Sequence, residues 1–174
     1  MPASPGEKLM PINEPSTREM VANINYGLRV DKGPVLATAW GVQVVYPLFN
    51  LVGGRVRILQ LIGEITTVLS NNATLVKYYF TPTGGAQIDL SAISLTIAQL
   101  AVGKRILAAG TIGGATTFSG IGASMEQTTP YIVGQVGVGG AIGIESTTAS
   151  LTSGAAKFSL WYIPLDDGAY VEAT

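Results

Sequence analysis

The acidic side chains near the C-terminus are the residues in this sequence best suited to metal chemistry. Asp166 and Asp167 are adjacent carboxylates, and hard cations such as Ca²⁺ prefer carboxylate oxygens as ligands. Gly168 follows the pair, however, and Asp-Gly is a strong signal for a two-residue hairpin turn, where two acids are usually just solvated. The sequence has no cysteine and no histidine, which removes thiolate sites and the commonest metal ligand. We therefore expect no metal site.

Other acids are candidates for a general acid and a general base. They are Glu64, Asp89, Glu126 and Glu145. Glycosidase-type chemistry needs two carboxylates held close together, and no two of these acids have a spacing that forces them to meet, although distance in sequence does not prevent it. Without a histidine, a serine hydrolase would need a Ser-Lys pair, and nothing distinguishes one lysine from the others. The sequence predicts a protein that is not an enzyme and has no catalytic residues.

Two glycine-rich stretches have some features of nucleotide-binding loops. Residues 137–143, GVGGAIG, are similar to a dinucleotide loop, but Ile142 stands in place of the third glycine and the surroundings favour strands over a strand-turn-helix unit. Residues 110–114, GTIGG, lack the Gly-Lys-Ser/Thr that completes a P-loop. We expect no cofactor.

The composition indicates a surface with few charges. Charged residues make up 12% of the chain, about half the usual share, whereas hydrophobic residues make up 47%. Either the surface is that of a weakly charged monomer or other chains cover much of it, and we expect a homo-oligomer. The net charge of −1 provides no basic field for nucleic acid, so we expect no nucleic-acid partner. No stretch reaches about 18 apolar residues without a charge, and the first residues lack a signal-peptide pattern, so we expect no membrane segment.

Residues 1–34 differ from the rest of the chain. They contain five of the nine prolines and eight of the 21 charged residues, which favours an extended N-terminal arm. Residues 16–19, STRE, fit a capping box and predict a short helix over residues 17–26. Such a helix is too short to be stable alone, so we expect Met20, Ile24 and Tyr26 to bind a partner surface. A disordered leader is the alternative.

From residue 35 to residue 174 the pattern is that of a β domain. Residues 53–69 are the clearest strand, because two arginines alternate with aliphatic residues and the apolar run at 59–62 predicts a long inner strand covered on both faces. Further strands are predicted at residues 37–45, 48–52, 73–80, 86–90, 104–109, 115–119, 135–145, 155–164 and 169–172. Pro47 marks a bend or an edge, and residues 91–102 favour a loop with a short strand. One face of residues 135–145 consists largely of glycine and so carries almost no side chains. Such a face either meets water or lets another sheet or subunit approach closely.

The strand at residues 53–69 and the C-terminal stretch at residues 155–173, AAKFSLWYIPLDDGAYVEA, also carry a family resemblance. Together they resemble the capsid decoration or cement class of virion structural proteins in tailed bacteriophages, over roughly residues 45–173. The resemblance implies a location on the capsid exterior, the major capsid protein as partner and, by analogy with decoration proteins at local threefold positions, a trimer.

These observations lead to one expected architecture and a small set of functions. We expect an all-β domain (residues 35–174), a β-sandwich, jelly roll or barrel, with an N-terminal arm (residues 1–34) that contains a short helix. The expected function is a decoration protein that binds the outer surface of the shell and stabilises it. The alternatives are a head-fibre or tail component, or a binding module for carbohydrate or a receptor. The loops at residues 119–129 and 146–153 contain no aromatic residue, which disfavours a binding module with its site in these loops.

Overall fold

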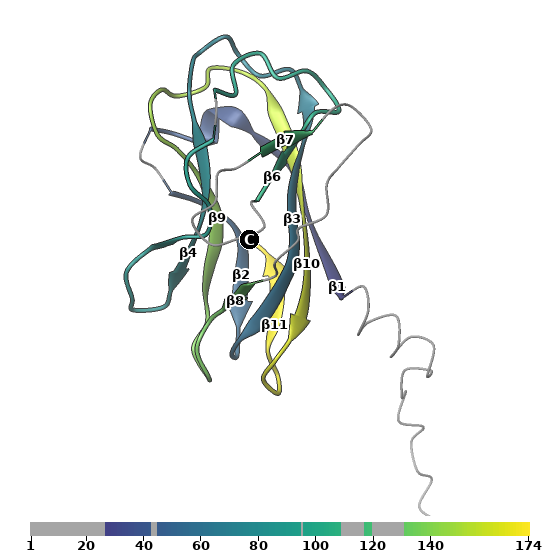
Figure 1. The fold of residues 1–174 in the computed structure, drawn as a ribbon, viewed down its shortest axis with the longest axis vertical. Helices are drawn as coiled ribbons and strands as arrows, with labels where there is room; N and C mark the ends of the chain where they lie inside the picture. Colours follow the sequence, from purple (N-terminus) through teal and green to yellow (C-terminus); the bar gives the residue numbers. More distant parts are fainter. Residues whose placement is uncertain (1–26, 43–44, 95, 109–116, 120–130) are drawn as a thin grey trace, which may run out of the picture.

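The computed structural model describes residues 27–42, 45–94, 96–108, 117–119 and 131–174. Within them the chain forms eleven β-strands in two antiparallel sheets that face each other as a sandwich (Figure 1). The sequence-based prediction of an all-β domain is confirmed. No helix in the described ranges has the length and apolar character needed to span a membrane.

The first sheet, sheet A, is built around the two longest strands of the described chain, which pair with each other. Its path runs through β1 (Leu28–Leu36), β10 (Ala155–Pro164), β3 (Val56–Thr67), β6 (Arg105–Leu107) and β7 (Thr117–Ser119), with β8 (Tyr131–Val133) also paired to β3. The strand β3 therefore has β10 on one side and both β6 and β8 on the other, as expected of a long inner strand.

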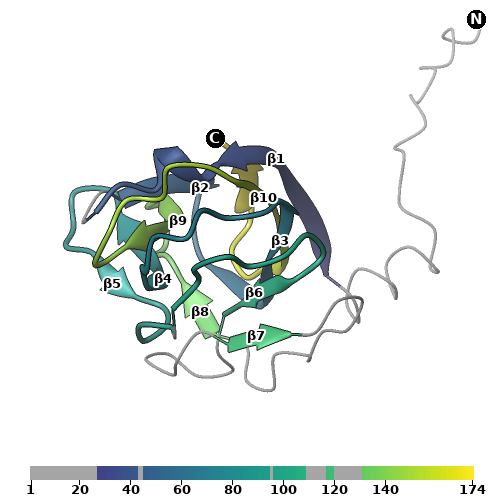
Figure 2. The same cartoon turned by 90° about the horizontal axis from the view of Figure 1, so that it is seen from above.

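The second sheet, sheet B, has the C-terminal strand at one edge, so the predicted hairpin turn at Asp167-Gly168 is wrong and this turn instead carries the chain from sheet A to sheet B. Its order is β11 (Tyr170–Ala173), β2 (Val45–Val52), β9 (Gly140–Ser146), β4 (Val76–Pro82) and β5 (Ile88–Asp89). The strands β4 and β5 form a hairpin, with Gly84 at φ +75° in the turn between them. Seen from above, the two sheets enclose the interior (Figure 2).

Aromatic and aliphatic side chains from both sheets fill the interior. Trp40, which follows the short 3-10 turn η1 (Ala37–Ala39), is fully buried and meets Phe158 of β10 edge to face at 5.7 Å between ring centroids. Tyr78 of β4 reaches across to sheet A, where its hydroxyl donates to the carbonyl of Ile106 at 3.1 Å. Burial of these large side chains on both sheets provides the main driving force that holds the layers together.

A β-bulge in β3 explains its continuous apolar run. Ile58 pairs with Tyr162 and Gln60 pairs with Trp161, so Leu59 is an extra residue on β3. The bulge changes which residues face the interior, because the buried positions are even-numbered before it and odd-numbered after it. The prediction that residues 59–62 are covered on both faces is therefore wrong. Residues 59, 60 and 62 are only partly buried.

Two predicted boundaries also differ from the structure. The strand β1 begins at Leu28, so residues 28–34, which were assigned to the arm, form part of sheet A. Residues 37–45 were predicted as a strand, but the described part of this range contains η1, irregular backbone and only the first residue of β2. Pro47 lies inside β2, at a point where the pairing with β9 shifts register, because proline has no N–H to donate to the ladder.

Candidate binding faces of the sandwich

One member of the carboxylate pair in the turn after β10, Asp166, is used by the fold. Asp166 Oδ2 accepts a hydrogen bond from the backbone N–H of Arg55 at 2.7 Å, and Oδ1 accepts one from Arg55 Nη2 at 2.6 Å. Hydrogen bonds from Arg55 hold the pKa of Asp166 below its usual value. Asp166 thus joins the turn between β10 and β11 to the turn that precedes β3. Across the described part of the chain, no three acidic side chains gather in a way that could hold a metal ion.

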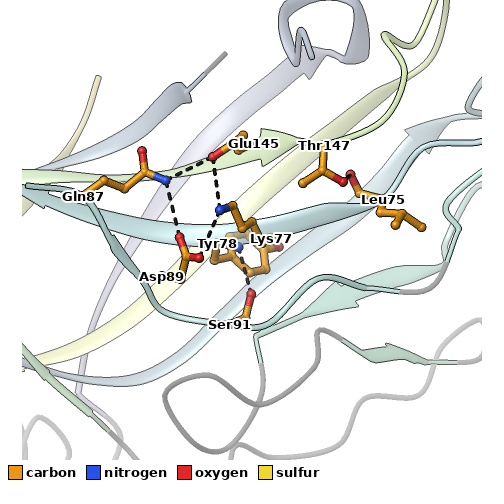
Figure 3. Close-up of polar contacts among 8 residues, drawn as sticks. All are labelled: Leu75, Lys77, Tyr78, Gln87, Asp89, Ser91, Glu145 and Thr147. Atoms are coloured by element: carbon orange, nitrogen blue, oxygen red, sulfur yellow. Dashed lines mark hydrogen bonds and ion pairs between the residues drawn. The ribbon is translucent and has the colours of Figure 1, made fainter. Parts of the chain in front are cut away.

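Two of the four scattered acids do meet, on the outer face of sheet B (Figure 3). Lys77 Nζ of β4 lies 3.0 Å from Asp89 Oδ2 of β5 and 3.6 Å from Glu145 Oε2 of β9. Gln87 Nε2 donates to Glu145 Oε2 at 3.0 Å. We call these four residues the sheet B cluster. Glu64 lies on the other sheet, and Glu126 is outside the described residues.

The geometry of the sheet B cluster favours a structural role. The ammonium of Lys77 occupies the space between the two carboxylates, where a catalytic pair would have to hold substrate or water. The three strands that supply the charges are adjacent in sheet B, so the ion pairs fasten the two-residue strand β5 to its neighbours. Partly exposed pairs of this kind each contribute up to about 1 kcal/mol.

Beside this cluster, the predicted bare glycine face is covered by the protein itself at Gly143 of β9. Tyr79 of β4 is paired with Gly143 of β9, and its ring lies where a side chain at Gly143 would be. Tyr79 is fully buried, and its hydroxyl has no hydrogen-bond partner among the described residues. Burial, helped by the charge of Glu145, raises the pKa of the Tyr79 phenol. Of the two predicted explanations, water or a second sheet or subunit, neither applies at Gly143.

The outer face of sheet A contains a groove of about 300 Å³ with both charged and aromatic side chains. We call it the sheet A groove, and its lining residues are Arg29, Gln60, Ile62, Glu64, Arg105, Lys157, Ser159 and Trp161. They come from four adjacent strands and form cross-strand rows, because Trp161 is paired with both Arg29 and Gln60, and Glu64 with both Lys157 and Arg105. Ser159 and Ile62 are paired with each other between these two rows.

At one end of the groove, several contacts hold a guanidinium group in place. The guanidinium of Arg29 lies over the Trp161 ring, 5.0 Å from its centroid. Its Nε donates to Asp31 Oδ1 at 2.8 Å, and the Ser159 hydroxyl donates to the same oxygen at 2.6 Å. The hydrogen bond from Ser159, and then the hydrogen bond and the charge of Arg29, lower the pKa of Asp31. The carboxylate therefore stays ionised and keeps Arg29 in position.

At the other end, one carboxylate holds two cations. Glu64 Oε1 lies 3.1 Å from Lys157 Nζ, and Glu64 Oε2 lies 3.4 Å from Arg105 Nε. The hydrogen bond from Lys157 is the main reason that the pKa of Glu64 is lowered. Both ends of the groove thus present cations that are already positioned by an ionised acid.

A third surface, where the two sheets meet, is apolar. Ile88 of β5, Ile132 of β8 and Val136 are 49%, 58% and 70% exposed, high values for aliphatic side chains. Ile88 and Ile132 border a hollow of about 150 Å³, and Val136 adjoins its lining at Gln135. We call these three aliphatic residues the β5–β8 patch.

The predicted partner-binding residues Met20, Ile24 and Tyr26 lie outside the described residues. The chain that follows them joins the sandwich at Gly27, whose φ is +70°. A Cβ at Gly27 would overlap the carbonyl oxygen of Tyr162, which explains why this junction needs glycine.

The sequence analysis did not predict the sheet A groove, although alternation along β10 is a signal for one side of it. Lys157, Ser159 and Trp161 alternate with buried residues, so the sequence places them on one face of a strand. Their partners Glu64 and Arg105 come from strands far away in the chain, and cross-strand register is not visible in a single sequence.

Comparisons with protein-family models, with curated proteins and with solved structures find no match to this chain.

Proposed function

We propose that the protein is a structural component of a bacteriophage virion that decorates the outer surface of the capsid and stabilises the shell. The observation that supports this most directly is the end of the sandwich at which β1 begins, which strand pairing and an ion pair hold together. Leu28 is paired with Tyr162, close to the two turns that the Arg55–Asp166 ion pair ties together. The residues that precede β1 therefore join the sandwich at an end that strand pairing and an ion pair hold together.

In this proposal the N-terminal residues make the contact with the major capsid protein. Met20, Ile24 and Tyr26 precede Leu28 by at most eight residues, so their contacts would place this end of the sandwich against the shell. An extended segment can add a strand to an exposed sheet edge while apolar side chains fill a groove. Ordering the segment costs conformational entropy, and many copies on one lattice would offset that cost through multivalency.

The proposed protein is a homo-oligomer, and a trimer would match a local threefold position on the shell. The β5–β8 patch is the surface that best fits contacts between copies, because exposed aliphatic side chains gain most from being covered. A head-fibre or tail component is the alternative within the same class of proteins.

Co-sedimentation with shells tests the proposal. Empty shells assembled from the major capsid protein of the phage that encodes the chain are mixed with the full chain, with a chain that lacks residues 1–26, and with Met20→Asp/Ile24→Asp. We expect the full chain to bind and both variants to bind at least about tenfold more weakly, which corresponds to about 1.4 kcal/mol.

The end point of the deletion matters for its control. A deletion through residue 26 leaves β1 intact, whereas one through residue 33 would remove six residues that belong to it. The shorter deletion should therefore keep the circular dichroism spectrum and melting temperature of the sandwich. Failure of the full chain to bind shells would overturn the proposal. If the truncated chain binds shells as tightly as the full chain, the sandwich makes the contact and residues 1–26 do not.

A further inference from the structure

We propose that the sheet A groove is a binding site for an acidic saccharide. This inference goes beyond attachment to a shell, because the groove lies on the outer face of sheet A and does not involve the N-terminal residues. Its volume of about 300 Å³ is at the lower end of the range for small-molecule sites.

The charges of the groove indicate an anionic ligand. Three cations, Arg29, Arg105 and Lys157, face two carboxylates, Asp31 and Glu64, so three minus two leaves one positive charge unmatched. Each guanidinium has five N–H donors. Arg105 uses its Nε on Glu64, and Arg29 uses its Nε on Asp31 and its Nη2 on the Ser159 hydroxyl at 3.4 Å. Donors therefore remain for a carboxylate or sulfate group of a ligand.

The cations are already held in place before a ligand arrives. The Trp161 ring and Asp31 fix the plane of the Arg29 guanidinium, and Glu64 fixes Lys157 and Arg105. All of these side chains stand on paired strands, not on loops. Binding would then lose little side-chain entropy, which is a general source of affinity.

The remaining lining explains why the ligand would be a sugar. The indole of Trp161 and the side chain of Ile62 provide apolar surface, whereas Gln60, Ser159 and Glu64 provide amide, hydroxyl and carboxylate groups. A pyranose ring has C–H groups on its faces and hydroxyl groups around its edge, so both kinds of surface would be used. An acidic peptide would use the cations but has no comparable ring of hydroxyl groups.

Tryptophan fluorescence provides a direct test, because the chain has two tryptophans in different places. Trp161 lines the groove, whereas Trp40 is fully buried in the interior. The probes are a trimer of galacturonic acid, a neutral maltotriose and a peptide of six glutamates. We expect the galacturonate trimer to change the emission in a saturable way, and the other two probes to bind at least about tenfold more weakly.

Variants separate this site from general attraction to a cationic surface. Lys157→Met should weaken binding of the galacturonate trimer about tenfold, because a charge-assisted hydrogen bond is lost. Arg57→Met is the matched control, since Arg57 is an exposed cation of β3 that does not line the groove. It should leave the affinity unchanged. In Trp161→Phe the emission of Trp40 should remain and the response to the ligand should disappear.

Other outcomes would overturn the inference. If the glutamate peptide binds more tightly than the galacturonate trimer, the groove is a site for an acidic protein partner. If maltotriose binds as tightly as the galacturonate trimer, the cations do not contribute to binding. A loss in Arg57→Met equal to that in Lys157→Met would show unspecific attraction. No response to any probe at millimolar concentration would mean that the groove is not a site for these ligands. The shell assay is independent of all these results, because Lys157→Met leaves the N-terminal residues untouched.

Discussion

At the scale of single residues, close approach between neighbouring strands explains a face that carries almost no side chains. Gly143 has no Cβ, and the space that a Cβ would need holds the hydroxyl oxygen of Tyr79 and the carbonyl oxygen of Tyr46. An aromatic side chain that covers a glycine on the paired strand is a known way to stabilise a sheet. The sequence reveals that the face is bare, but the residue that covers it depends on the register of β4 against β9.

The exchange Gly143→Ala tests this explanation. The added methyl group would overlap Tyr79 and backbone at Tyr46, so we expect the free energy of unfolding to fall by about 1–3 kcal/mol. Gly33→Ala is the matched control in β1, because no atom lies within 4 Å of the Cβ position there. It should leave stability unchanged or raise it by a few tenths of a kcal/mol. Denaturation in urea measures both, and equal effects would contradict the explanation.

At the scale of the elements, side chains of a loop complete the edge of a strand. The strand β4 is paired with β5 only at Tyr79 and Phe80, so its earlier residues lack a neighbouring strand on that side. The backbone N–H of Tyr78 instead donates to the Ser91 hydroxyl at 2.9 Å, as Figure 3 shows, and that of Val76 donates to the Ser94 hydroxyl at 2.9 Å. Residues 91–94 thus continue the sheet without forming a strand.

Replacing either serine tests whether the edge of β4 depends on these two hydroxyl groups. In Ser91→Ala or Ser94→Ala a buried N–H loses its acceptor, and we expect a loss of about 1–3 kcal/mol in each variant. Amide hydrogen exchange should accelerate at Tyr78 in the first variant and at Val76 in the second. Ser150→Ala, at an exposed position, is the control. Unchanged exchange at Tyr78 and Val76 would show that these hydroxyls are dispensable.

The elements also show how much of the fold can be predicted from sequence. The strands β3, β4 and β10 were predicted because alternation of apolar and polar residues is a local property of the sequence. The bulge at Leu59 and the start of β1 at Leu28 were not predicted, since both are set by pairing with β10. Contacts in the candidate sites could not be predicted for the same reason. Lys77 lies between Asp89 and Glu145 only because three strands are paired in a particular register.

At the scale of the whole molecule, the surfaces of the sandwich differ in character. The sheet A groove and the sheet B cluster hold ion pairs on the two outer faces, and the β5–β8 patch is apolar. A protein with only 12% charged residues has few charges to spare, and most of those described are paired within a face. The apolar patch is therefore the surface with the most to gain from a neighbouring copy.

Sedimentation of the purified chain tests whether copies of the protein meet at the β5–β8 patch. We expect a homo-oligomer at micromolar concentration, with an interface of at least about 1,200 Å² if the assembly is stable. Ile132→Glu should shift the protein to monomers, because the charge would have to be buried without a partner at the interface. Leu36→Glu is the matched control, since Leu36 is 65% exposed but belongs to β1, on the other side of the β10–β3 pair.

Both substitutions place glutamate at a strongly exposed position, so both variants should retain the circular dichroism of the parent protein. Leu36→Glu should sediment as the parent does. If the parent protein is a monomer at tens of micromolar, the proposed homo-oligomer is wrong. If instead Leu36→Glu dissociates the assembly and Ile132→Glu does not, the copies meet through the edge at β1, and the β5–β8 patch has another role.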